Sequence, residues 1–234
     1  MAKVLLMRLM QHSLVPAMAL AVAVFAVAPS QATPLACAVP TGVGATVLPG
    51  DCTGLDGGAF VASTVDPWTF APSTLTHGTL DAAVFRNASG TLDFYYQINN
   101  DATSATPLRA ESNTDFSGFL TSLGFDTKGA TDLGGPFVNG GNIPETGDHP
   151  FPQVVGFNFN VSGTDFILPG HSSAVLVIST DATNFTKGFS EILDGGSATV
   201  STYQPAAVPE PTSVMLLGSG LFALGLLRKK QKKA

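Results

Sequence analysis

The central part of the chain consists of short runs in which apolar and polar residues alternate or in which β-branched and aromatic residues gather, separated by turn residues. Alternation with a period of two places successive side chains on opposite faces of a strand, and no long stretch shows the 3.6-residue period of a helix. Their spacing predicts an all-β fold, an antiparallel β-sandwich of the Ig-like or jelly-roll type, over residues 33–204. The predicted strands are residues 59–64, 79–86, 91–98, 116–125, 153–161, 173–180 and 196–203.

Three further features of this part lead to specific expectations. Residues 126–152 contain six Gly and four Pro and are predicted to form a long loop. Tyr95 and Tyr96 are adjacent and must face opposite sides of a strand, as expected for a sheet with one face in water. Trp68 is the only tryptophan, and it is interpreted either as a core or loop-anchoring residue or as a platform for stacking a sugar.

Charge is segregated along the sequence. Residues 1–32 carry two basic residues and no acid, and residues 228–234 carry five basic residues and no acid. Residues 33–227 hold 17 acids against four basic residues, a net charge of −13 within a chain total of −6. The middle has no basic patch to neutralise phosphates, which argues against binding to nucleic acid. Basic, apolar ends around an acidic middle indicate an exported protein whose two ends are handled at a membrane.

The amino end has the three parts of a secretory signal peptide. Lys3 and Arg8 precede the apolar run 14–28, and small residues follow at Ser30 and Ala32. We therefore predict a signal helix within residues 1–32 that the Sec translocon exports and signal peptidase cleaves after Ala32. Two alternatives stay open: a retained anchor helix, although 15 apolar residues are few for a span, and a lipoprotein acylated at Cys37.

The sequence contains two cysteines, Cys37 and Cys52, both just beyond the predicted cleavage site. An oxidising compartment favours a disulfide between such an isolated pair. The bond would enclose 14 residues and contribute about 3 kcal/mol through loop entropy. The alternatives are two free, buried thiols or a metal site, and a metal site lacks companion ligands nearby.

No local motif indicates catalysis. His77, His149 and His171 are far apart in the sequence, and HExxH, GxSxG and CxxC patterns are absent. We predict that the protein is not an enzyme and has no metal or cofactor, although a Ser-His-Asp triad assembled from distant segments stays open. Gly-rich loops with acidic residues give a weaker expectation of Ca²⁺ binding through Asp51, Asp56, Asp132 and Asp148. Asn-x-Ser/Thr sequons occur at Asn87, Asn160 and Asn184.

The carboxyl end carries the strongest signal. Residues 205–211 read PAAVPEP, a proline-rich linker, and residues 212–227 contain no charge. As a transmembrane helix these 16 residues would rise about 24 Å, which is short for a hydrocarbon core of about 30 Å. The basic residues of the tail, 228–234, would stay on the cytoplasmic side. This arrangement is typical of a C-terminal sorting signal, with a plain tail anchor as the alternative. The basic residues are Arg228, Lys229, Lys230, Lys232 and Lys233.

Together the motif Val208-Pro209-Glu210-Pro211, the apolar stretch and the basic cluster resemble the PEP-CTERM sorting domain, a tail also described as an ice-binding-protein C-terminal motif. The resemblance covers about residues 207–231. It implies a Gram-negative bacterium that makes exopolysaccharide or biofilm matrix, and it implies that exosortase recognises Pro209, Glu210 and Pro211 and removes the tail.

The combined expectation is an exported, noncatalytic surface or matrix protein, transiently anchored in the inner membrane and then delivered to the cell surface or released. Association with exopolysaccharide is part of this expectation. The alternatives are a secreted hydrolase acting on a matrix glycan or ester, and a module that binds carbohydrate or ice.

Overall fold

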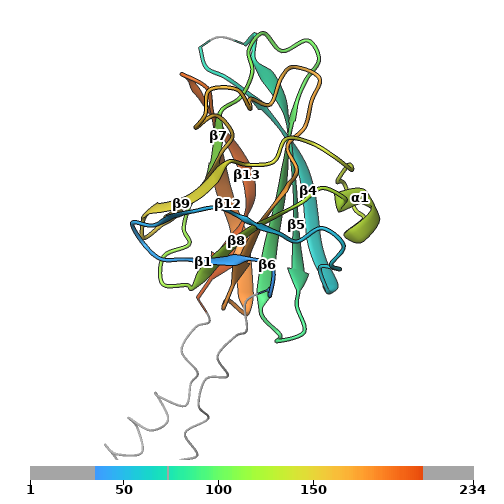
Figure 1. Ribbon diagram of the computed structural model, residues 1–234, viewed down its shortest axis with the longest axis vertical. Coiled ribbons are helices and arrows are strands. Elements are labelled where there is room, and N and C mark those ends of the chain that lie inside the picture. Colours follow the sequence, from blue (N-terminus) through green and yellow to red (C-terminus); the bar gives the residue numbers. More distant parts are fainter. Residues whose placement is uncertain (1–34, 73, 208–234) are drawn as a thin grey trace, which may run out of the picture. The chain divides into compact units, whose positions relative to one another are not determined.

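The computed structural model describes residues 35–72 and 74–207 (Figure 1). Several predicted features lie outside the described residues: the signal peptide with its cleavage after Ala32, the sorting motif 208–211, the transmembrane helix 212–227 and the basic tail 228–234. Within the described ranges no helix is long and apolar enough to cross a membrane. The single helix there, α1 (Gly129–Asp132), has four residues.

The described chain forms two β-sheets, in agreement with the predicted all-β class. Sheet A has the order β1 (Val39–Thr41), β8 (Thr121–Asp126), β11 (Val175–Thr180), β6 (Leu92–Asn100), β5 (His77–Arg86) and β4 (Ala59–Thr69), and β3 (Gly50–Asp51) also pairs with β8. Sheet B has the order β13 (Ser197–Ala206), β12 (Asn184–Leu193), β7 (Ala110–Asn113), β10 (Val154–Asn158), β9 (Thr146–Phe151) and β2 (Thr46–Val47). All pairings are antiparallel except that of β3 with β8.

The main hydrophobic core lies between the inner faces of the two sheets. Sheet A contributes residues such as Leu80, Phe94 and Ile178, and sheet B contributes residues such as Phe157 and Val200.

Two tyrosine hydroxyls join the sheets across this core. The hydroxyl of Tyr96 donates to the carbonyl oxygen of Tyr203 at 2.7 Å, and the hydroxyl of Tyr203 donates to the carbonyl oxygen of Ser63 at 2.9 Å. The first bond satisfies a carbonyl group of β13, an edge strand of sheet B, and the second satisfies a carbonyl group of β4, an edge strand of sheet A.

The outer face of sheet A is also covered, which corrects the expectation of a water-exposed face behind the adjacent tyrosines. Tyr95 and Tyr96 are both buried. Tyr95 packs in a second cluster with Phe85, Val175 and Val177, and this cluster is closed by the amino-terminal segment and by the segment around Phe137. Strands β5, β6 and β11 are therefore buried almost continuously, because both of their faces are covered.

The predicted disulfide is present, with Sγ of Cys37 and Sγ of Cys52 bonded at 1.99 Å. The enclosed segment supplies two strands along one edge of β8. β1 pairs with residues 121–123, and β3 continues along residues 124 and 125. The disulfide thus ties together the beginning and the end of the segment that covers this edge.

Several strand predictions need correction. The predicted strand 116–125 begins only at Thr121, and the predicted loop 126–152 contains α1 and β9. Strands β7 and β12 were not predicted. Strand β13 continues through Pro205 to Ala206, two residues into the predicted linker. Proline is tolerated there because β13 is an edge strand, so a missing N–H need not break the ladder.

Removal of the disulfide tests how far the covering segment depends on it. We expect the double variant C37S/C52S to lose about 3 kcal/mol of unfolding free energy, because the reduced unfolded chain gains loop entropy. Denaturant unfolding followed by tryptophan fluorescence of Trp68, which is buried, measures the change. The wild-type protein in reducing agent should match the double variant, and equal stability of oxidised wild type and variant would contradict the expectation.

Candidate functional site

Both ends of the described chain lie at the same end of the sandwich (Figure 1). The backbone N–H of Leu35 donates to the hydroxyl of Ser179 at 3.1 Å, one residue before the end of β11. At the other terminus Ala206 pairs with Asn184, the first residue of β12. The short loop 181–183 joins β11 to β12, so it connects Ser179, which binds Leu35, with Asn184, which pairs with Ala206. The carboxyl end of the described chain therefore lies near the point where the described chain begins.

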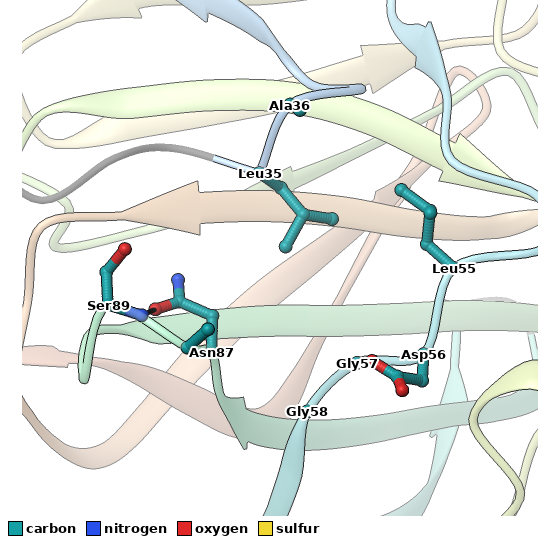
Figure 2. A pocket seen from close by; sticks show the side chains of 9 residues that line it. Leu35, Ala36, Leu55, Asp56, Gly57, Gly58, Asn87 and Ser89 are labelled. Carbon is teal, nitrogen blue, oxygen red and sulfur yellow. Dashed lines mark hydrogen bonds between the residues drawn. The ribbon is translucent and has the colours of Figure 1, made fainter.

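A pocket of about 340 Å³ lies at this amino-terminal entry (Figure 2). Leu35 and Leu55 line one side of it, and Asn87 and Ser89 of the β5–β6 loop line the other. Asp56 is its one titratable side chain. A second pocket of similar volume, lined by the loops before β2 and β8, also has one titratable side chain, His149. Neither pocket holds the pair of carboxylates that glycoside hydrolysis needs.

The side-chain amide of Asn87, the first residue of a sequon, is engaged in hydrogen bonds within the protein. Its amide nitrogen donates to the hydroxyl of Thr91 at 2.9 Å and to the carboxylate of Asp93 at 3.2 Å. Its amide oxygen accepts the backbone N–H of Ser89 and of Thr91. The side chain thus holds the β5–β6 turn in place and is committed to that role. Attaching a glycan at this nitrogen would break these contacts.

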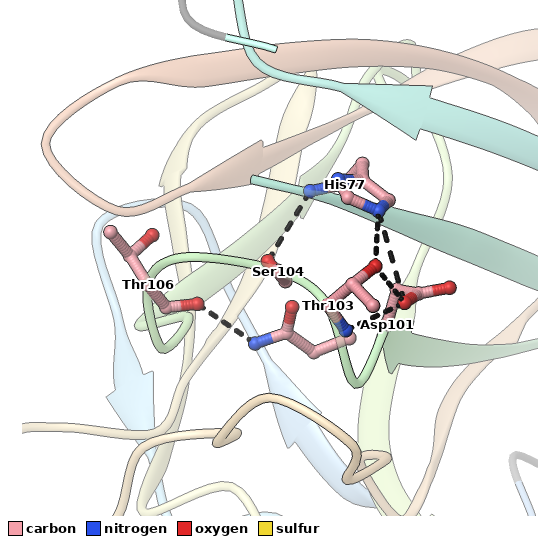
Figure 3. A network of polar contacts seen from close by, with 6 residues as sticks. His77, Asp101, Thr103, Ser104 and Thr106 are labelled. Atoms are coloured by element: carbon pink, nitrogen blue, oxygen red, sulfur yellow. Dashed lines mark hydrogen bonds and ion pairs between the residues drawn. The ribbon is translucent and has the colours of Figure 1, made fainter. Parts of the chain in front are cut away.

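The histidines predicted to stand apart do not form a catalytic group with a serine. His77 Nε2 lies 3.1 Å from the hydroxyl of Thr103 and 3.8 Å from Asp101 Oδ1 (Figure 3). The Thr103 hydroxyl donates to Asp101 Oδ1 at 2.7 Å, so its hydrogen is already committed and the imidazole acts as a donor to it. Ser104 accepts the backbone N–H of His77 and does not contact the ring. This network closes a loop and activates no nucleophile.

The remaining histidines lie elsewhere. His149 is buried, with Nδ1 at 3.2 Å from the Thr121 hydroxyl and Nε2 at 3.3 Å from the carbonyl oxygen of Pro152. His171 is exposed in the loop before β11, where its carbonyl oxygen accepts the N–H of Asn100. The three rings therefore occupy three different environments.

Three of the four aspartates suggested for Ca²⁺ accept hydrogen bonds from other residues of the protein. Asp51 accepts the N–H of Thr53 at 2.9 Å, Asp132 accepts the N–H of Gly54 at 2.6 Å, and Asp148 accepts the amide of Asn158 at 3.2 Å. Within residues 35–72 and 74–207 no group of three or more His, Cys, Asp or Glu residues is arranged to hold a metal ion. Calcium binding stays a prediction without a structural site.

Trp68 is 2% exposed and packs against Phe70 in the main core, so it is unavailable for stacking a sugar. Three phenylalanine rings on strands face solvent: Phe60 on β4, Phe151 at the end of β9 and Phe189 on β12, with exposed fractions of 58%, 60% and 56%. Phe189 lies in the interior of β12, between β13 and β7. No sequence pattern indicated that Phe189 is exposed, because β12 was not predicted and the chain contains sixteen Phe.

Phe189 stands on the outer face of sheet B, which differs from the covered outer face of sheet A. Strand register places Ser201 beside Phe189 and, one row along, Thr199, Glu191 and Ser112 across β13, β12 and β7. The row continues through Gly156 and Asp148. This face, hereafter the sheet B face, combines one exposed aromatic ring with hydroxyl and carboxylate groups. That mixture is suited to contacts with a carbohydrate, whose rings present both C–H and hydroxyl groups.

Four acids are buried, Asp81, Asp93, Glu111 and Asp126, and burial raises the pKa most at Glu111 and Asp93. Burial raises the pKa of Glu111, on β7, to about 8. Ser190 and Asn113 offset part of this rise, although neither makes a well-formed hydrogen bond to the Glu111 carboxyl oxygens. Burial likewise raises the pKa of Asp93 to about 6, partly offset by the hydroxyl of Ser179, which donates to it at 2.6 Å.

Glu111 should make the domain less stable as the pH rises. Between pH 4.5, where the unfolded side chain loses its proton, and pH 8, the folded protein still holds that proton. Unfolding free energy therefore falls by about 1.4 kcal/mol per pH unit in this window, and the cost at pH 7 is about 3 kcal/mol. We expect Glu111→Gln to recover about this amount at pH 7 and almost none at pH 4.

Chemical denaturation of both proteins from pH 4 to pH 8 measures this difference. Glu191→Gln is the matched control, because it removes a carboxylate from the partly exposed outer face of the same sheet and should change stability by less than about 0.5 kcal/mol. A Glu111→Gln difference that is independent of pH would disprove the assignment.

Comparison with known proteins identifies the segment that follows the sandwich. Residues 207–230 match the family described as the PEP-CTERM protein-sorting motif, which confirms the resemblance predicted from the sequence. No curated protein and no solved structure matches the chain. The motif indicates exosortase-dependent sorting of an exported protein to the cell surface of a Gram-negative bacterium. The match begins at Ala207, the residue directly after β13.

Proposed function

We propose that this chain is a noncatalytic surface or matrix protein, whose β-sandwich is delivered by the tail and then associates with exopolysaccharide through the sheet B face. The observation that carries the sorting half is the PEP-CTERM motif at residues 207–230. In this proposal the signal peptide brings the chain to the Sec translocon, signal peptidase cuts after Ala32, and residues 212–227 hold the protein in the inner membrane until exosortase acts.

Removing the tail would cost the domain no strand pairing. The last paired residue of β13 is Ala206, and Val208-Pro209-Glu210-Pro211 follows it within two residues. A cut at or beyond the motif thus leaves every pair between β12 and β13 in place. The released domain, residues 33–207, would carry 16 acids and four basic residues, a net charge of −12 that favours solubility.

The sheet B face supports the association with a glycan. The outer face of sheet A is less open, because the disulfide-bonded segment and the chain around Phe137 cover its centre and leave Phe60, on the edge strand β4, as its exposed aromatic ring. The sheet B face instead leaves Phe189 open beside Ser201 and near Glu191. With a net charge of −12, we expect the domain to retain neutral polysaccharides directly and acidic ones only when divalent cations bridge the two.

Alanine replacement of Pro209, Glu210 and Pro211 tests the sorting half. We expect the variant to keep its tail, so that release into the medium falls at least about tenfold and the protein remains with the membranes. Intact-mass analysis of the cell-associated and released protein measures processing at both ends. A control variant replaces Pro150, Phe151 and Pro152, another Pro-x-Pro tripeptide, which is exposed in the β9–β10 hairpin. Normal processing of the 209–211 variant would refute the proposal.

Phe189→Ala tests the glycan half. Truncating a central aromatic contact typically costs more than 1 kcal/mol of binding energy, so we expect retention by exopolysaccharide purified from the same strain to weaken at least about fivefold. Affinity electrophoresis with and without Mg²⁺ measures this. Phe60→Ala is the matched control, since Phe60 is 58% exposed on β4, a strand of sheet A. Equal retention of both variants and wild type would exclude this face.

A further inference from the structure

Two loop tips at one end of the sandwich expose apolar side chains. Val43, in the loop between β1 and β2, is 58% exposed, and Leu120, just before β8, is 66% exposed. Half-buried Phe119 lies beside them, and all three line one pocket of about 340 Å³. We call these three residues the end patch.

Strand register places the end patch at the end of the domain from which the tail continues. In sheet A, Thr41 pairs with Thr121, and Thr121 pairs with Thr180. The N–H of Leu120 donates to Asp181 Oδ1 at 2.9 Å, which joins its loop to the loop 181–183. That loop leads directly to Asn184, the pairing partner of Ala206.

The chain between the domain and the apolar tail is short. Five residues lie between Ala206 and Thr212, and a fully extended chain over these six residue-to-residue steps reaches only about 20 Å. While residues 212–227 are inserted in a membrane, this end of the sandwich is therefore held close to the bilayer. The tether raises the effective concentration of the end patch at the lipid surface, so even a weak contact is populated.

The charge distribution favours the same contact. Residues 33–207 carry 16 acids, and an acidic surface is repelled by anionic lipid headgroups. The loops 42–45 and 117–120 contain no charged residue, and neither does the neighbouring loop 87–90. An acid, Asp181, lies beside these loops, and its carboxylate accepts the N–H of Leu120. The uncharged loops can approach the headgroups with less repulsion than the rest of the acidic domain, and their exposed apolar side chains gain from leaving water.

We infer that the end patch is a membrane-contact surface, which inserts Val43, Phe119 and Leu120 into the interfacial region of the lipid bilayer before the tail is removed. The inference rests on the proposed membrane insertion of the tail. It deepens that function, because contact at this end fixes the junction after Ala206 at the membrane surface, where a membrane enzyme must reach it.

Fluorescence quenching in vesicles tests the inference with the full chain. Val43→Cys, labelled with a nitrobenzoxadiazole dye after the native disulfide has formed, is reconstituted into phosphatidylethanolamine–phosphatidylglycerol vesicles containing a lipid spin-labelled near its headgroup. The matched control is Val161→Cys, since Val161 is also a valine, 64% exposed, in the loop after β10. Position 161 lies at the other end of the sandwich. The N–H of nearby Phe159 donates to the carbonyl oxygen of Arg109, which precedes β7, whereas Asn113 ends that strand. Flotation in alkaline carbonate reports insertion of the tail separately.

We expect at least twofold stronger quenching at position 43 than at position 161, and we expect Leu120→Asp, but not Val161→Asp, to reduce the quenching at position 43. Equal quenching in protein that floats with the vesicles would overturn the inference and leave the sorting proposal intact. Protein that fails to float would overturn both. Protection of position 43 that appears only when exosortase is present in the vesicles would assign the patch to the enzyme and overturn the lipid contact.

Discussion

The burial of both faces of sheet A depends on the covalent bond between Cys37 and Cys52. Tyr95, Val175 and Val177 point away from the main core and would face water without the amino-terminal segment above them. That segment is short and has few strand pairs of its own, so the disulfide limits its freedom in the unfolded chain. Export to an oxidising compartment therefore favours the full fold, because the disulfide persists there.

At the carboxyl end, by contrast, the fold of the domain does not depend on the sorting segment. Strand β13 makes ten consecutive pairs with β12, and the sorting motif starts only after the last of them. Tyr203, three residues before that last pair, receives the bond from Tyr96 and donates to Ser63. A cut within β13 would sever these links between the sheets. A cut after Ala207 leaves them unchanged, so the tail can be removed from a domain that is already folded.

The sequence predicted the features that depend on local pattern or on a single pairing, and it missed those that depend on tertiary cover. Alternation located β5, β6 and β11, and the isolated cysteines predicted their own bond. β7 was missed because its inward positions, Glu111 and Asn113, are polar, which inverts the usual pattern. The cover over Tyr95 comes from residues more than forty positions away as well as from the amino-terminal segment, and no local period records it. Phe189 has no signal in sequence because exposure of one Phe among sixteen is set by the sheet around it.

The net charge of the released domain is smaller in magnitude than its composition implies. Sixteen acids and four basic residues give −12, but burial keeps Glu111 protonated at neutral pH because its pKa is raised to about 8. The effective charge is thus nearer −11. Glu111 stays neutral because its side chain lies in the core, where no solvent would stabilise a carboxylate. The remaining acids are distributed unevenly: loops 42–45, 87–90 and 117–120 contain none, although Asp181 lies beside them, whereas the sheet B face carries Glu191 and Asp148. In the proposed arrangement these uncharged loops meet an anionic membrane with little repulsion, and the face proposed for the glycan disfavours an anionic polymer unless cations are present.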